Sequence, residues 1–190
     1  MRQDDELTLL KERARAVQTI TAEVADIRAA CQYAVDVTLR QGGSSIAAPG
    51  VSGKGLTVLK AVCKAGGLNL LTKNLRKNIG QISTGLTMAD WGIAETATLV
   101  MDSTSEDFRI ATMLCETHVC ILPKSRIVPD AMSLEDELAS ALKDAPRYLA
   151  FISGASRTAD IERVLTIGVH GPRELHLLIL EDTSNDKNAS

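Results

Sequence analysis

The stretch WGIAETATLVMDS, residues 91–103, places a carboxylate among small and apolar residues. Glu95 follows a segment with the composition of a buried strand, and Thr96 and Thr98 add hydroxyl groups beside it. A carboxylate is costly to bury unless a partner or a proton neutralises it. Glu95 is therefore a candidate general base, nucleophile or ligand-orienting group. The alternative is a structural glutamate that pairs with an arginine or a backbone N–H.

A second polar stretch follows the apolar segment YLAFIS and precedes a helical pattern. It contains Ser153, Gly154, Ser156, Arg157 and Thr158. A helix N-terminus offers free N–H groups to a carboxylate or phosphate, and an arginine can clamp such an anion with paired donors. Capping of the helix by Ser156 or Thr158, with a solvated Arg157, is the structural alternative.

Both stretches follow apolar strands, and the carboxyl ends of parallel strands open on the same edge of a sheet. We therefore predict one small-anion site in which Glu95 is the catalytic residue. The predicted substrate contacts come from Thr96, Thr98, Ser153, Gly154, Ser156, Arg157 and Thr158. His170 is a secondary candidate, because its loop precedes the last strand and is expected at the opposite edge.

The four cysteines are Cys31, Cys63, Cys115 and Cys120, and no pair has the C-x-x-C spacing of a zinc or iron–sulfur site. We interpret them as reduced, mostly buried small hydrophobes. The sequence therefore predicts no metal site and no cofactor in this chain.

The formal net charge of −3 gives no electrostatic reason to expect nucleic acid or an acidic membrane surface. No apolar run is long enough to span a bilayer, and the first residues lack the apolar stretch of a secretory signal. We expect a cytoplasmic protein without membrane insertion.

Residues 4–40 contain neither Gly nor Pro, and their apolar positions recur at steps of three and four. This spacing predicts an amphipathic helical segment, broken at most once. Its apolar face packs on its own domain or, as the alternative, on a partner, which leaves a homodimer open.

From residue 44 onward, short apolar runs alternate with helical patterns. Strands are expected at 45–48, 68–71, 91–95, 98–101, 118–122, 148–152 and 174–180. Helices are expected at 56–63, 107–114, 134–142 and 158–166, and 85–90 fits a single helical turn. The alternation predicts a three-layer α/β domain with a mostly parallel sheet. We divide the chain into a helical segment at 1–43, an α/β domain at 44–182 and a disordered tail at 183–190.

Four segments resemble the signature of the LUD-domain family of lactate-utilization proteins. They are GLTMADWGIAET from Gly85, LPKSRIVP from Leu122, ISGASRTADIE from Ile152 and GVHGP from Gly168. Four motifs in one order are far more specific than any one of them. The chain is most similar to the C-type members, which lack iron–sulfur motifs.

The resemblance implies the fold of the sugar-phosphate isomerase and coenzyme A transferase superfamily. It also implies a role in oxidising L-lactate to pyruvate, in a complex whose partner subunits carry iron–sulfur clusters. This chain would bind the small anionic substrate or organise the complex. Ala97 stands where the family usually has glycine, which disfavours a close backbone approach to a ligand.

Two other functions remain open at this point. Coenzyme A transferases of this fold use a glutamate nucleophile, so the chain could be a self-sufficient acyl or phospho-metabolite transferase or ligase acting through Glu95. It could also be a non-catalytic module that binds a small anion. Turnover by the isolated chain would favour the former, and ligand binding without turnover or partners would favour the latter.

Overall fold

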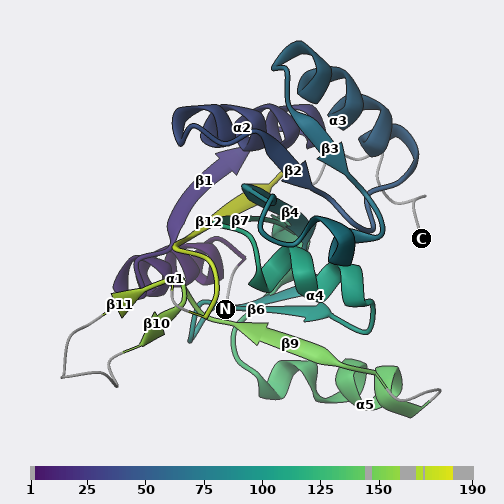
Figure 1. The fold of residues 1–190 in the computed structure, drawn as a ribbon. Helices are drawn as coiled ribbons and strands as arrows, with labels where there is room; N and C mark the ends of the chain where they lie inside the picture. The colour runs from purple at the N-terminus through teal and green to yellow at the C-terminus, as the bar shows by residue number, and fades with distance from the viewer. Residues whose placement is uncertain (1–2, 144–146, 159–165, 169, 182–190) are drawn as a thin grey trace.

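Six parallel strands form the main sheet of the computed structural model, in the order β1-β12-β7-β4-β2-β3 (Figure 1). The structure describes all residues except 1–2, 144–146, 159–165, 169 and 182–190. The strands are β1 (Ile20–Val24), β12 (Glu174–Leu180), β7 (Thr117–Pro123), β4 (Thr84–Met88), β2 (Ser45–Ala47) and β3 (Asn69–Leu71). Every pairing among them is parallel, which confirms the predicted α/β class.

Helices cover both faces of this sheet (Figure 1). On one face lie α2 (Ile27–Arg40) and α3 (Gly53–Ala65), whose apolar residues join one core with β4, β7 and β12. On the other face lie α1 (Gln3–Ala16) and α4 (Glu106–Met113). Strands apolar at nearly every position, such as ELHLLIL in β12, suit a sheet that is covered on both sides.

A second sheet packs below the main one, in the order β8-β5-β6-β9. Its strands are β8 (Ile127–Val128), β5 (Trp91–Ile93), β6 (Thr98–Asp102) and β9 (Leu149–Ile152). The β5–β6 and β6–β9 pairings are antiparallel. The strands predicted at 91–95, 98–101 and 148–152 therefore exist, but they do not belong to the main sheet. Helix α5 (Glu135–Lys143) follows Leu134, which packs on the outer face of this second sheet.

Short elements complete the described chain. Three 3₁₀ turns are η1 (Leu75–Asn78), η2 (Lys124–Arg126) and η3 (Met132–Leu134), and β10 (Arg157–Thr158) pairs antiparallel with β11 (Thr166–Ile167). The described helices include none long and apolar enough to cross a membrane. The predicted disordered tail, 183–190, lies outside the described residues.

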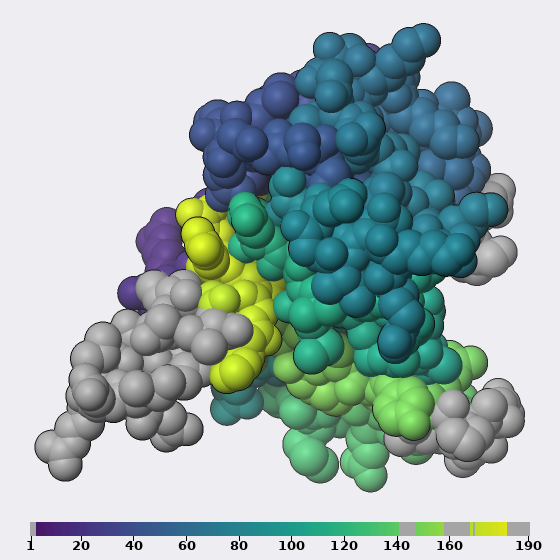
Figure 2. Space-filling view, viewed as in Figure 1, coloured from purple at the N-terminus to yellow at the C-terminus, as the bar shows by residue number. Residues whose placement is uncertain are grey.

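The helical segment predicted at residues 4–40 is broken once, into α1 and α2, and strand β1 within the break corrects the prediction that the rest is helical. Helix α1 ends in a Schellman motif, in which the Thr19 N–H bonds the Ala14 carbonyl (2.8 Å) and the Gln18 N–H bonds the Arg15 carbonyl (3.0 Å). Gln18 takes the left-handed position of this motif, with φ of 58°, where glycine is the usual signal. The chain then pairs with β12, so that N-terminal and C-terminal residues border each other on the surface (Figure 2).

Strand β4 corrects a second prediction, the helical turn at 85–90. Gly85 lies within β4 at the point where α4 crosses it, and a Cβ at this position would stand 2.0 Å from the Ala111 carbonyl oxygen. The glycine is thus required for close packing of a helix on a strand. Because glycine is also common in turns, the sequence pattern wrongly indicated a turn here.

We predict that Gly85→Ala lowers the free energy of unfolding by about 3 kcal/mol or prevents folding, because backbone must move to admit the methyl group. Gly55→Ala is the matched control. Gly55 lies in α3, where a Cβ would make ordinary contacts of 3.6 Å with Val51, so this change should be neutral or stabilise by up to about 1 kcal/mol. Urea titration measures both, and equal effects would contradict the packing argument.

Candidate functional site

Glu95 lies in the turn between β5 and β6. Strand β5 ends at Ile93, residues 94–97 form the turn, and the Glu95 N–H bonds the Pro129 carbonyl (3.0 Å) while the residue is exposed. Glu95 therefore lies near the end of a strand, as predicted, but the prediction that its carboxylate is buried is wrong. Water solvates the carboxylate, so no buried partner is needed to explain it.

Ala97, in the same turn, takes a left-handed backbone conformation, with φ of 50°. This conformation costs alanine on the order of 1 kcal/mol relative to an ordinary one. The methyl group is buried in the core cluster that includes Leu7, Leu10 and Leu99, which offsets part of that cost. Alanine thus adopts a turn geometry that glycine would enter without strain.

A chain of hydroxyl groups joins the two polar stretches that the sequence singled out. The Oγ1 atoms of Thr96 and Thr98 lie 2.7 Å apart, and Thr98 Oγ1 lies 2.6 Å from Ser153 Oγ. Strands β6 and β9 pair antiparallel with Leu99 opposite Ile152, so the start of one lies beside the end of the other. The two polar stretches therefore lie close together, as predicted. Antiparallel strands of the second sheet bring them together, not parallel strands of the main sheet.

The loop that follows β9 is hydrogen-bonded to the C-terminal end of α1. Arg157 donates a hydrogen bond from Nη2 to the Val17 carbonyl, and a Cβ at Gly154 would stand 2.7 Å from the same oxygen. Gly154 also has φ of 81°, so a larger residue would be strained as well as crowded. No sequence pattern could single out Val17, because a main-chain carbonyl is common to all residues.

The helix predicted at 158–166 is wrong at both ends. Arg157–Thr158 and Thr166–Ile167 are the paired strands β10 and β11, and residues 159–165 lie outside the described part of the chain. Thr158 is therefore a strand residue rather than the first residue of a helix. Arg157 is exposed and carries several N–H donors, of which one contacts Val17.

This polar cluster lies at the amino edge of the main sheet. Val17 precedes β1, and the carbonyl of Pro172, which precedes β12, accepts a bond from the Ser156 N–H (3.0 Å). The sequence predicts the site at the carboxyl edge, and the structure corrects this placement. His170, expected at the opposite edge from the site, is exposed in the adjoining loop, where Gly171 approaches Ser156 closely.

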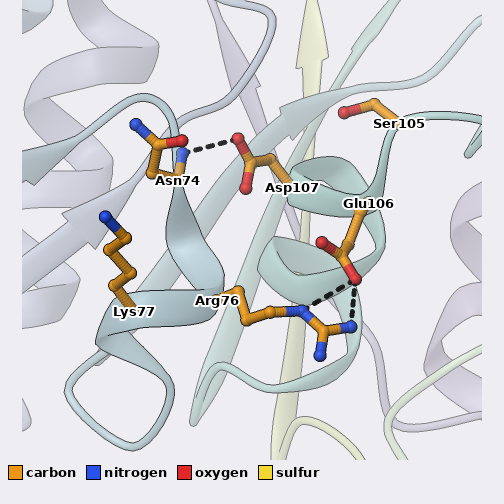
Figure 3. A pocket seen from close by; sticks show the side chains of 6 residues that line it. All are labelled: Asn74, Arg76, Lys77, Ser105, Glu106 and Asp107. Atoms are coloured by element: carbon orange, nitrogen blue, oxygen red, sulfur yellow. Dashed lines mark hydrogen bonds and ion pairs between the residues drawn. The ribbon is translucent and has the colours of Figure 1, made fainter.

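A separate cavity of about 430 Å³ lies between η1 and the first turn of α4 (Figure 3). Its lining residues are Asn74, Arg76, Lys77, Ser105, Glu106 and Asp107. Arg76 pairs with Glu106, and one Asp107 carboxylate oxygen accepts a bond from the Asn74 N–H (Figure 3). The other Asp107 oxygen accepts a bond from the Leu75 N–H, and both bonds are 2.7 Å long. Its acidic groups are thus satisfied internally, and none of the predicted site residues lines it.

All four cysteines are buried free thiols, and burial raises the pKa of Cys115 and of Cys120 to about 12. Such thiols stay protonated at neutral pH, so they are poor nucleophiles and poor metal ligands. The described residues hold no group of three or more metal-ligating side chains.

Comparison with known proteins places the chain in a family. The LUD domain matches residues 7–180. The chain belongs to the LUD-domain family. The match begins within α1, so α1 and β1 are part of the family domain rather than an extension that precedes it.

Similar proteins bear the name lactate utilization protein C. The relative from Bacillus velezensis is 34% identical over 113 residues, which cover 58% of this LUD-domain chain and 46% of the relative. The relative from Bacillus licheniformis is 27% identical over 199 residues, which cover 95% of the chain and 80% of the relative. In the first of these the match spans about half the length of the relative.

One solved structure is similar in fold. It is the crystal structure of a DUF162 family protein from Deinococcus radiodurans, with a TM-score of 0.62 and 15% identity over 95% of this chain and 99% of that one. At this identity the likeness establishes the fold alone.

We predict that Thr98→Val lowers the free energy of unfolding by about 1–2 kcal/mol, because the buried Thr98 hydroxyl has two hydroxyl partners. Thr96→Val is the control: Thr96 is exposed at the end of the chain of hydroxyls, so this change should cost about 0.5 kcal/mol or less. Thermal or urea unfolding would reveal the difference, and equal costs would argue against a cooperative hydroxyl chain.

Buried His118 predicts a loss of stability in mild acid. Its Nε2 lies 2.8 Å from Thr87 Oγ1, Nδ1 has no partner among the described residues, and burial lowers its pKa to about 4. The folded pKa is below the unfolded value of about 6.5, so stability is full above pH 6.5 and falls as the pH drops toward 4. The total loss is on the order of 3 kcal/mol.

His118→Gln should remove this part of the pH dependence, whereas His170→Gln, at an exposed position, should keep it. Urea midpoints measured between pH 4 and pH 7.5 test the assignment. A wild-type slope that persists in His118→Gln would assign the acid sensitivity to other groups.

Proposed function

We propose that this chain is a cytoplasmic subunit of a complex that oxidises L-lactate to pyruvate. The observation that carries the proposal is its family membership, together with similarity over 95% of the chain to a protein named lactate utilization protein C. Removal of two electrons from lactate requires an acceptor. In the proposal, iron–sulfur clusters of partner subunits accept them, as the family resemblance implies.

The same proposal assigns the polar cluster at the amino edge to a small hydroxy acid. Thr96, Thr98 and Ser153 present a line of hydroxyl groups, and Glu95 lies exposed in the adjoining turn. A carboxylate beside hydroxyl donors suits a substrate that carries its own hydroxyl group. Arg157 would contribute its remaining N–H donors to the substrate carboxylate.

The arrangement gives Glu95 a task that does not require burial. Closure by a partner subunit would remove water from the Glu95 carboxylate and strengthen its interactions with the substrate. The isolated chain should therefore bind lactate weakly and turn nothing over, while the assembled complex is active.

Affinity purification of the tagged chain from its native cell tests the complex. Co-purifying proteins with iron–sulfur absorbance and lactate-dependent dye reduction are the expected result. Recovery of the chain alone, with lactate oxidation in the cell unaffected by its deletion, would overturn the proposal.

Glu95→Gln should lower the activity of the assembled complex at least about tenfold, because the change removes the base without changing its shape. Its melting temperature should stay within about 2 °C of wild type, since Glu95 is exposed and surface changes are usually small in effect. Glu135→Gln, at an exposed position in the first turn of α5, is the matched control and should keep full activity.

A further inference from the structure

A glutamate, a histidine and a tyrosine form a hydrogen-bonded series outside the candidate site. Glu174 Oε2 lies 2.9 Å from His176 Nε2, and His176 Nδ1 lies 2.9 Å from Tyr33 Oη. Glu174 and His176 belong to β12, whereas Tyr33 belongs to α2 on the face opposite α1. This glutamate–histidine–tyrosine series links a strand to the helix that covers it.

For an ionised carboxylate and a neutral imidazole, the order of the series sets which atom donates each proton. An ionised carboxylate only accepts, so His176 Nε2 must carry the hydrogen that bonds Glu174. In neutral imidazole the other nitrogen is then an acceptor, and Tyr33 must donate its hydroxyl proton to Nδ1. A carboxylate thus orients a base, and the base faces a hydroxyl group, which is the arrangement of activated nucleophiles.

Further contacts hold the first member of the series in place. Gln41 Nε2 donates to Glu174 Oε2 (2.7 Å), and the Gln41 Oε1 accepts a bond from Thr117 Oγ1 (2.6 Å). The Glu174 side chain is 45% exposed, while that of His176 is 5% exposed. The series therefore leads from a solvated carboxylate to a buried base and then to Tyr33, which is of intermediate exposure.

We propose that Tyr33 is an acylation site, with His176 as its general base and Glu174 as the group that orients the base. In the step, the Tyr33 oxygen attacks the carbonyl carbon of an activated acyl compound while its proton passes to His176 Nδ1. The new O–C bond forms as the bond from carbon to the leaving group breaks. The proton on His176 then passes to the leaving group, which restores the neutral imidazole.

The resting state of the hydroxyl group agrees with this order of events. Burial raises the pKa of Tyr33, although the nearby cation of Arg40 acts in the opposite direction. The group is therefore a phenol at neutral pH, and its proton must leave during the attack. His176, already hydrogen-bonded to the hydroxyl group, can accept that proton. This chemistry is independent of the proposed lactate role.

The chain contains a built-in comparison, because it has two tyrosines. Tyr148 is 68% exposed and contacts the guanidinium of Arg109, with no imidazole partner among the described residues. N-acetylimidazole, a small reagent that acetylates phenols, is the probe. Tryptic cleavage separates the two tyrosines into different peptides, so mass spectrometry can follow each rate on the intact, folded chain.

Tyr33 should be acetylated at least about tenfold faster than Tyr148 at pH 7.5, despite its lower exposure, because general-base assistance is typically worth 10²–10⁴ in rate. In guanidinium chloride the two rates should become equal. Faster labelling of Tyr148 in the folded chain would overturn the proposal. The three side chains would then have only a structural role, linking α2 to β12 by hydrogen bonds.

Variants identify the source of the reactivity. Glu174→Gln and His176→Gln should each bring the Tyr33 rate down to that of Tyr148 or below it. Asp36→Asn is the matched control, because Asp36 is an exposed carboxylate one turn from Tyr33 that bonds Gln32 instead of the series. Glu174 is partly exposed, so Glu174→Gln should fold, and an unchanged Tyr33 rate in that variant would also overturn the proposal.

Discussion

The parallel pairing of β1 with β12 is the contact on which the rest of the molecule depends. It joins the start of the chain to its last described strand, with Ile20 opposite His176 and Val24 opposite Leu180. Because β1 lies between α1 and α2, the pairing also fixes those helices on opposite faces of the sheet. The candidate site and the glutamate–histidine–tyrosine series both rely on this placement.

On one face, α1 ends beside the loop that follows β9. The Val17 carbonyl at its end receives Arg157 and approaches Gly154, so the position of the loop depends on the helix. On the other face, α2 brings Tyr33 to His176. One strand pairing thus places two sets of polar groups at the amino edge of the sheet, even though they face different layers.

Close contact between layers makes small residues necessary at particular points. Gly85 lies against the Ala111 carbonyl of α4, and a Cβ at Gly92 would stand 2.4 Å from Leu122 of β7. The second sheet can approach the main one at Gly92 because no side chain intervenes there. In the sequence, such glycines look the same as turn glycines. Their role is set by the helix or strand that packs against them in the fold.

The sequence alone determined the α/β class, the parallel main sheet, the family and the polar segments worth examining, because apolar periodicity and residue type act locally. Tertiary structure decided the exposure of Glu95, the extended form of Ile20–Val24, the second sheet and the edge at which the polar cluster lies. Ile20 and Val24 suit a helix or a strand equally well by spacing. Pairing with β12, more than a hundred residues away, selects the strand, and such a long-range contact leaves no local pattern to read.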